Sequence, residues 1–130
     1  MFYRIAYFLI TLYSRLVCRR KITGREHVPE RGPFIVIVNH LSTVDPPLVL
    51  SVLPAHLGMT GMAAMAHRND FFIGWLMDRC GAIWVRRGQS DRRALRQALE
   101  TLESGRPIGL SPEGTRSDTG ALIEGKSGAA

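Results

Sequence analysis

Short apolar runs that alternate with helical patterns are the strongest constraint on the fold of this chain. Residues 34–38 form a continuous run rich in β-branched side chains between turn signals, which predicts a buried strand. Two shorter runs, at 82–85 and 108–110, predict further strands, and a fourth is expected within 58–66. Because strands alternating with helices form layered folds, we expect an α/β fold with a mostly parallel sheet flanked by helices.

Helices are predicted in the gaps between these strands. Apolar side chains recur at helical spacing between residues 90 and 104, which makes this the clearest helix of the chain. A second helix is expected over residues 71–79. A third is expected to begin at Asp45, as an N-cap followed by a first-turn proline, and to end before Pro54.

The N-terminal segment, residues 2–17, is mostly apolar but interrupted by charge. On a helix, Arg4, Thr11 and Arg15 form a narrow polar stripe, and the large apolar side chains point away from it. The run is shorter than the roughly 20 apolar residues that cross a bilayer. A basic cluster at 19–21 suits an anionic membrane. We therefore expect an amphipathic helix on the membrane surface, with a core-packing helix as the alternative.

These features divide the chain into two parts. Residues 1–21 form the membrane-interface helix with its basic cluster, and residues 22–130 form one compact domain, since 130 residues leave no room for two. The formal charge of +6 attracts anions such as nucleic acid, acidic membranes or phosphorylated metabolites. Nucleic acid is the least favoured partner, because the arginines are scattered and no recognised binding module is present.

Cysteine and histidine spacing gives no sign of a metal site. Cys18 and Cys80 lie far apart, and the four histidines show no ligand spacing with cysteine or carboxylate. We expect no metal and a reducing compartment, because a disulfide framework would need more cysteines. The apolar surroundings of Cys80 indicate a core residue rather than a nucleophile.

His40 and Asp45 form the pattern H-x-x-x-x-D between a predicted strand and a predicted helix. Across such a turn the carboxylate can fold back and hold one imidazole nitrogen, which leaves the other free to take a proton from a hydroxyl. No protein nucleophile accompanies the pair, so a substrate alcohol would attack an activated acyl group directly. Taken alone the pattern is weak, because a histidine packed in a turn and a helix-capping aspartate give the same spacing.

A glycine-containing turn at 113–117 supplies a second chemical feature. Its backbone amides can cradle a phosphate, and Arg116 adds a fork of donors suited to phosphate oxygens. A surface turn with a solvated arginine is the alternative. Both His40 and Glu113 directly follow predicted strands, and ligands gather at the carboxyl ends of parallel strands, so the two residues can share one site.

Taken together, these motifs resemble those of the glycerolipid acyltransferase family. The resemblance lies in Asn-His-Leu-Ser-Thr-Val-Asp at 39–45 and Pro-Glu-Gly-Thr-Arg-Ser at 112–117, in that order. The loop at 22–33, the block at 81–87 and the Lys-Ser-Gly-Ala element at 126–129 agree with it. The nearest branch resembles the 1-acylglycerol-3-phosphate acyltransferases. Domains of this family continue beyond the last element, so the resemblance implies that 22–130 is the N-terminal part of such a domain.

The resemblance implies a membrane enzyme that needs no cofactor. A fatty acyl group would pass from coenzyme A or acyl carrier protein to the free hydroxyl of a membrane lysophospholipid, such as 1-acylglycerol 3-phosphate. His40 would be the general base and Asp45 its orienting partner. The enzyme would work at an anionic membrane surface on the cytoplasmic face of the cell membrane. By position, the residues implied in substrate binding are Arg87, Glu113, Gly114, Thr115 and Arg116.

Two positions depart from the family pattern. His67, followed by Arg68, stands where the family often has a lysine, and Ser111 stands where it usually has a phenylalanine. Two alternative functions also remain open. The same His–Asp pair could activate water in a thioester hydrolase, or the chain could be a non-catalytic, membrane-bound fragment of an acyltransferase.

Overall fold

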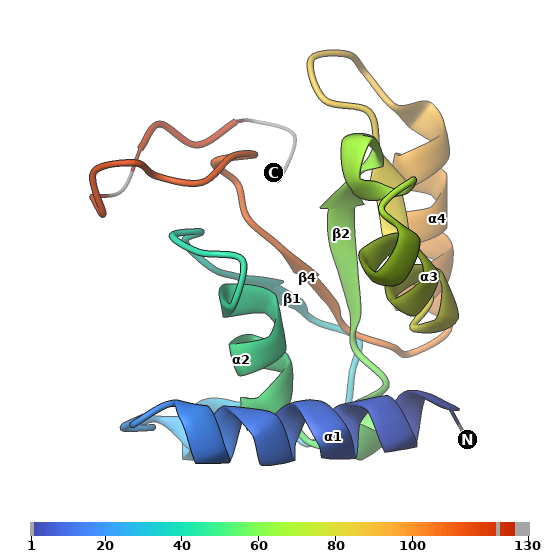
Figure 1. Ribbon diagram of the computed structural model, residues 1–130. Helices are drawn as coiled ribbons and strands as arrows, with labels where there is room; N and C mark the ends of the chain where they lie inside the picture. Colours follow the sequence, from blue (N-terminus) through green and yellow to red (C-terminus); the bar gives the residue numbers. More distant parts are fainter. Residues whose placement is uncertain (1, 122, 127–130) are drawn as a thin grey trace.

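The protein is a single parallel sheet with helices on both faces (Figure 1). The computed structural model describes residues 2–121 and 123–126. The helices are α1 (Phe2–Val17), α2 (Asp45–Val52), α3 (Phe71–Arg79) and α4 (Arg92–Glu103). The strands are β1 (Ile35–Ile37), β2 (Thr60–Ala64), β3 (Ile83–Val85) and β4 (Ile108–Leu110). Single 3-10 turns lie at Arg25–His27, Ala55–Leu57 and Met65–His67.

The four strands pair in the order β1-β4-β2-β3, and every pair is parallel. Ile108 of β4 lies level with Ile35 on one side and with Thr60 on the other. The last strand in the sequence is therefore central in the sheet. Since all strands run the same way, the residues that follow β1 and β4 emerge side by side at one edge. The predicted α/β class with a mostly parallel sheet is confirmed.

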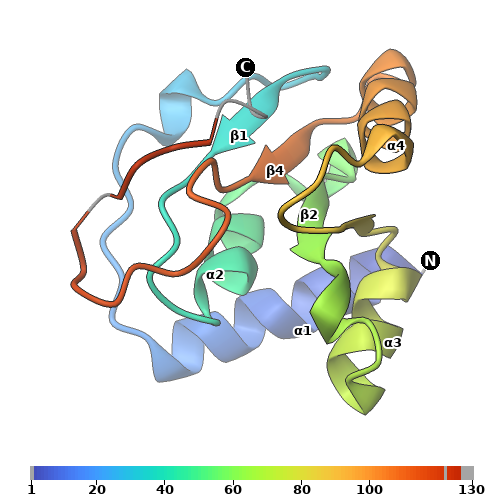
Figure 2. The same cartoon turned by 90° about the horizontal axis from the view of Figure 1, so that it is seen from above.

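The main hydrophobic core lies between the sheet and α4. It is built from Ile83, Ala94, Ala98 and Ile108, all buried. Helix α4 lies on one side of the sheet, and α1, α2 and α3 lie on the other (Figure 2). The side chain of Asp91 caps α4 by accepting a hydrogen bond from the Ala94 N–H at 3.1 Å.

Helix α1 packs against α2 through small and polar side chains. Ala6 and Ser14 are buried in this contact. The hydroxyls of Tyr3 and Tyr7 donate hydrogen bonds to the carbonyl oxygens of Met59 (3.3 Å) and Leu53 (2.7 Å). The helix is thus fixed to the protein by its small and polar face.

The predicted polar stripe of α1 is covered at one position. Thr11 belongs to the face that meets the protein, and its hydroxyl oxygen is enclosed rather than solvated. The large apolar side chains point outward as predicted: Ile5, Phe8, Leu9, Leu12, Tyr13, Leu16 and Val17 are all exposed. No helix in the described part of the chain is long and apolar enough to cross a membrane.

Strand β1 forms where it was predicted, but it is not buried. Ile35 and Ile37 are 45% and 60% exposed, while Val36 between them is partly covered. In the strand order β1 lies at the edge of the sheet, with a neighbouring strand on one side only, and its two isoleucines are about half covered at most. A continuous apolar run indicates that a strand is suited to burial, but it does not identify the segment that would cover the strand.

Candidate active site

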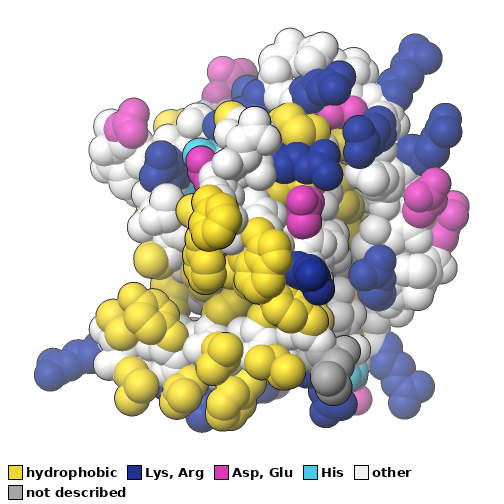
Figure 3. All heavy atoms as spheres, turned by 45° about the vertical axis from the view of Figure 1, so that its right-hand side comes forward, with side chains coloured by type: hydrophobic (Ala, Val, Ile, Leu, Met, Phe, Trp, Pro, Cys, Tyr) yellow, Lys and Arg dark blue, Asp and Glu magenta, His cyan; other side chains and the backbone are white. Residues whose placement is uncertain are grey.

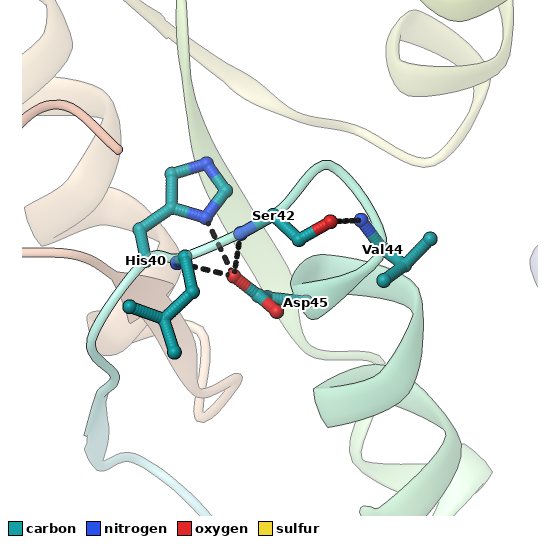
Figure 4. A network of polar contacts seen from close by, with 5 residues as sticks. His40, Ser42, Val44 and Asp45 are labelled. Atoms are coloured by element: carbon teal, nitrogen blue, oxygen red, sulfur yellow. Dashed lines mark hydrogen bonds and ion pairs between the residues drawn. The ribbon is translucent and has the colours of Figure 1, made fainter. Parts of the chain in front are cut away.

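The turn between β1 and α2 folds Asp45 back onto His40 (Figure 4). Asp45 Oδ2 lies 3.0 Å from His40 Nδ1 and accepts hydrogen bonds from the backbone N–H groups of Leu41 and Ser42, each at 2.6 Å. Because an ionised carboxylate only accepts, His40 Nδ1 is the protonated nitrogen of the neutral ring. His40 Nε2 is then the unprotonated nitrogen and the site at which the ring accepts a proton.

The predicted capping role of Asp45 is wrong. Val44 occupies the N-cap position of α2, and Asp45 is the first helical residue, with Pro46 next to it. The carboxylate turns away from the helix because the amides of Leu41 and Ser42 and the imidazole of His40 all point at one of its oxygens. The side chain therefore holds the turn together rather than the helix end.

The same contacts keep Asp45 ionised. Burial by itself would raise the pKa of Asp45, but the hydrogen bonds from the Ser42 amide, the His40 ring and the Leu41 amide prevail and lower that pKa below its ordinary value of 3.8. Both side chains of the pair are 22% exposed, so the site is open to a reactant. The arrangement is that of a positioned base with a charged partner.

The Pro112–Ser117 turn after β4 lies directly against this pair. The backbone N–H of Ser117 donates a hydrogen bond of 2.8 Å to the carbonyl oxygen of His40, and the Val38 N–H donates to Leu110 O at 3.1 Å. Pairing of β1 with β4 thus brings the two predicted motifs together, although 72 residues separate the first residue of each, His40 and Pro112 (112 − 40).

Glu113 is the buried member of this turn. Its side chain is 3% exposed, and its Oε2 atom is enclosed without a hydrogen-bond partner in the described part of the chain. An enclosed carboxylate oxygen is costly unless something donates to it. Glu113 is therefore directed into the turn, whose Ser117 amide bonds to the His40 carbonyl.

Gly114 has a left-handed backbone, with φ at +66°, and Lys126 lies across it. A Cβ atom at position 114 would come within 3.4 Å of Lys126 Nζ, and the Lys126 N–H donates to the Pro112 carbonyl at 2.7 Å. The side chain of Lys126 therefore adds a positive charge to the turn. The rest of the predicted element, residues 127–129, lies outside the described residues.

The remaining predicted substrate-binding residues differ in their distance from the turn that carries Glu113. Thr115 and Arg116 are exposed on the same turn as Glu113. Arg87 is exposed just after β3, which is separated from β4 by β2. Arg87 thus shares the carboxyl edge of the sheet with the others, but it is not in their immediate cluster.

His67 and Arg68, which replace the expected lysine region, both have partners. His67 Nδ1 lies 3.2 Å from Asp70 Oδ2. The guanidinium of Arg68 lies 3.7 Å from Asp78 Oδ1 and 5.9 Å from the ring centre of Trp84. These contacts tie the end of β2 to α3 and β3.

Neither a cysteine nucleophile nor a metal centre emerges from the geometry. Burial raises the pKa of the Cys80 thiol, which disfavours the thiolate at neutral pH. Among residues 2–121 and 123–126, no three His, Cys, Asp or Glu side chains come together in a way that would hold a metal ion. An open hollow lined by residues such as Gln97, Thr101 and Arg106 contains none of the predicted site residues.

The fold and the His–Asp turn lead to one class of protein. The model of the Acyltransferase family matches residues 19–130, so the chain belongs to this family. The resemblance drawn from the sequence is confirmed at the level of the family.

Individual relatives agree with the family. The chain is 33% identical over 93 residues to the lyso-ornithine lipid O-acyltransferase of Pseudomonas aeruginosa, covering 71% of this chain and 34% of that protein. It is 32% identical over 110 residues to the 1-acyl-sn-glycerol-3-phosphate acyltransferase of Saccharomyces cerevisiae, covering 78% and 34%. The chain thus spans about a third of the length of these curated relatives.

A solved structure is also similar. The crystal structure of the 1-acyl-sn-glycerophosphate acyltransferase of Thermotoga maritima superposes with a TM-score of 0.76 at 27% identity. The superposition covers 96% of this chain and 51% of the solved chain. The arrangement of α1, the sheet and the remaining helices is therefore shared almost throughout.

Two residues of this site were not predicted as site residues. Ser117 is buried, and its hydroxyl donates to the Ala121 carbonyl at 2.5 Å while its amide holds His40. Lys126 returns to the Pro112–Gly114 turn. In the sequence, Ser117 and Lys126 are marked only by their positions within two motifs. Their contacts join segments that are distant in the sequence, so these contacts could not be predicted from it.

Proposed function

We propose that the protein transfers a fatty acyl group from a thioester of coenzyme A or acyl carrier protein to the free hydroxyl of a membrane lysophospholipid. The acceptor best suited to the site is 1-acylglycerol 3-phosphate, which would become phosphatidic acid. One observation carries the proposal: a His–Asp pair whose His40 carbonyl is hydrogen-bonded to a glycine turn that bears Arg116 and is approached by Lys126. The activities named for the yeast and Thermotoga relatives support it.

The chemistry is a direct transfer. His40 Nε2 takes the proton of the acceptor hydroxyl as its oxygen attacks the thioester carbonyl carbon. A C–O bond forms, the C–S bond breaks, and the departing thiolate takes the proton back from the imidazolium. The Asp45 carboxylate stabilises the imidazolium that forms during the step.

The turn after β4 would bind the acceptor head. The exposed guanidinium of Arg116 and the Lys126 ammonium supply donors and positive charge for the phosphate. The buried Glu113 and the left-handed Gly114 would shape the pocket for the glycerol part of the lipid. Thr115 lies between these groups on the same turn, and Arg87 would add a longer-range positive charge.

A lyso-ornithine lipid is the second candidate acceptor, because the Pseudomonas relative is named for it. An ornithine head group carries an ammonium group and no phosphate. The basic Arg116–Lys126 surroundings favour the phosphate over such a head group. Exchange of Arg116 for alanine therefore separates the two: KM for a phosphate acceptor should rise about tenfold or more, and KM for an ornithine acceptor should not.

Association with an anionic membrane is the second part of the proposal. The exposed apolar side of α1 would lie in the interface of the cytoplasmic leaflet, next to the basic cluster at 19–21. This position would let the acceptor pass from the bilayer surface to His40.

The deciding experiment uses the purified chain with liposomes, a long-chain acyl-CoA and lysophosphatidic acid. Free thiol and diacyl lipid are measured together in the same reaction. We expect equal amounts of the two products, and loss of both in His40→Ala. The matched control is His27→Ala, which removes a histidine whose side chain is 83% exposed and remote from the pair in sequence.

The other outcomes favour the other functions. Thiol release without diacyl lipid would indicate a thioester hydrolase. Folded protein without any turnover would indicate a non-catalytic fragment. Activity that survives His40→Ala would refute the general-base role.

A further inference from the structure

Helix α3 displays its large apolar side chains to solvent. Phe71 is 97% exposed and Phe72 is 65% exposed, and Trp75 on the same face is half exposed. The fully buried residue of α3 is Gly74, where a Cβ atom would lie 2.0 Å from the Arg68 carbonyl oxygen, and Leu76 and Met77 are partly buried. The helix is therefore built with its small residue inward and its aromatic residues outward.

This pattern repeats that of α1. In both helices the fully buried residues are small, and most of the large apolar side chains are exposed, although Ile10 of α1 and Leu76 and Met77 of α3 are partly buried. Figure 3 shows the hydrophobic side chains of the two helices gathered on one face of the molecule, with Lys and Arg around the margin. Single exposed apolar residues are ordinary, but a continuous patch on two helices marks an interaction surface.

The two helices are joined within this patch. The rings of Phe2 and Trp75 meet edge to face with their centres 5.5 Å apart. The guanidinium of Arg79 lies 5.9 Å from the Phe2 ring centre and 5.8 Å from that of Trp75. A cation over two aromatic rings at the margin of an apolar patch is suited to the boundary between lipid and water.

We propose that α3 is a second lipid-inserting element, with Phe71, Phe72 and Trp75 entering the membrane interface beside the apolar face of α1. This inference rests on the membrane association proposed above for α1, and it adds a partner surface that the sequence did not predict.

The positive charge around the patch favours an anionic bilayer as its binding partner. Residues 2–25 contain six basic side chains and no Asp or Glu. These side chains are Arg4, Arg15, Arg19, Arg20, Lys21 and Arg25. A second copy of the chain, related by a twofold axis, would bring like charges together around the patch. An anionic leaflet instead attracts them.

The test compares vesicle binding of two double variants. Phe71→Ser with Phe72→Ser removes the α3 aromatics, and both side chains are exposed, so the fold is retained. The control is Leu95→Ser with Leu99→Ser, which removes two leucines that are 58% and 52% exposed on α4, across the sheet. Flotation is measured with vesicles of phosphatidylcholine and phosphatidylglycerol, without acyl donor or acceptor.

We expect vesicle affinity to fall at least about tenfold in the α3 variant and to stay unchanged in the control. Equal binding by wild type and the α3 variant would overturn the inference. A concentration-dependent dimer that disappears only in the α3 variant, with vesicle binding intact, would also overturn it and identify a second copy as the occupant.

Trp75 gives an independent readout. Vesicles that contain brominated phosphatidylcholine should quench its fluorescence, and Trp75→Phe should remove the quenched component, because the other tryptophan, Trp84, is buried. Absence of quenching in vesicle-bound protein would refute insertion of α3.

A third variant separates this inference from the proposed function. Leu9→Ser, Leu12→Ser and Leu16→Ser together remove apolar side chains from α1 only. Loss of binding in this variant alone would leave the α1 proposal standing and reject α3. Unchanged binding in both the α1 and the α3 variants would reject both. Acyl transfer is measured separately, so its presence or absence does not affect either reading.

Discussion

At the scale of single residues, Asp45 decides the geometry of the site. One of its oxygens accepts from two backbone amides and from the His40 ring. The two amides fix the turn, so the carboxylate is in place before any substrate binds. His40 is then held with Nε2 directed away from the carboxylate, as the proposed general-base role requires.

Replacement of Asp45 by asparagine tests this role. The amide oxygen can still accept from the two backbone amides, but it no longer stabilises an imidazolium. We expect kcat to fall on the order of 10³–10⁴-fold with the acceptor KM nearly unchanged, as measured by initial rates of diacyl lipid formation. A fall in kcat of less than about tenfold would show that the charge of Asp45 is not used.

The same residue gives a pH dependence of stability. Because the folded-state pKa of Asp45 is lowered below 3.8, its contribution to stability is fully present above the unfolded-state pKa and is lost as the pH falls through the folded-state pKa. The difference in Tm between wild type and Asp45→Asn should therefore shrink as the pH falls below about 4. A difference that persists or grows as the pH falls below that value would contradict the lowered pKa.

At the scale of elements, α1 and α3 share an inverted design. In each helix the fully buried residues are small or polar, and most of the large apolar side chains are exposed. Ordinary surface helices do the opposite, with an apolar stripe toward the core. The closeness of α3 to Arg68 depends on the absence of a side chain at Gly74.

Exchange of Gly74 for alanine should therefore destabilise the protein, although alanine is normally the better helix former. The added Cβ would lie 2.0 Å from the Arg68 carbonyl oxygen. We expect the free energy of unfolding in urea to fall by about 1–3 kcal/mol. Gly61→Ala is the matched control, because nothing lies within 4 Å of the added atom. It should be neutral or stabilise by up to about 1 kcal/mol. Similar losses for both would argue against tight packing of α3.

At the scale of the whole molecule, α1 belongs both to the fold and to the outer surface. Its tyrosines bond to the carbonyls of Leu53 and Met59, while its leucines remain exposed. Removing the helix therefore changes more than membrane contact.

Deletion of residues 1–18 should lower Tm by roughly 5–10 °C, because two hydrogen bonds are lost and α2 is uncovered. The triple exchange Leu9→Ser, Leu12→Ser and Leu16→Ser should leave Tm nearly unchanged. Scanning calorimetry of both proteins checks this. If the deletion has no effect on Tm, α1 does not contribute to the stability of the fold.

The sequence by itself determined the local structure. The β-branched run before His40, the helical spacing from 90 to 104 and the limits of α3 were all predicted, because torsional preference and periodicity are properties of neighbouring residues. The candidate pair, His40 and Asp45, was predicted for the same reason, since only a turn of a few residues joins them.

Only the tertiary structure decided which distant segments meet and which apolar faces stay open. Placement of β4 beside β1 brings Ser117 to His40, while the position of β3 keeps Arg87 farther away. The exposed Ile35 and Ile37, and the aromatic face of α3, could not be predicted either. The physical reason is that an apolar pattern shows which side chains favour burial. Which surface covers those side chains depends on how the whole chain packs.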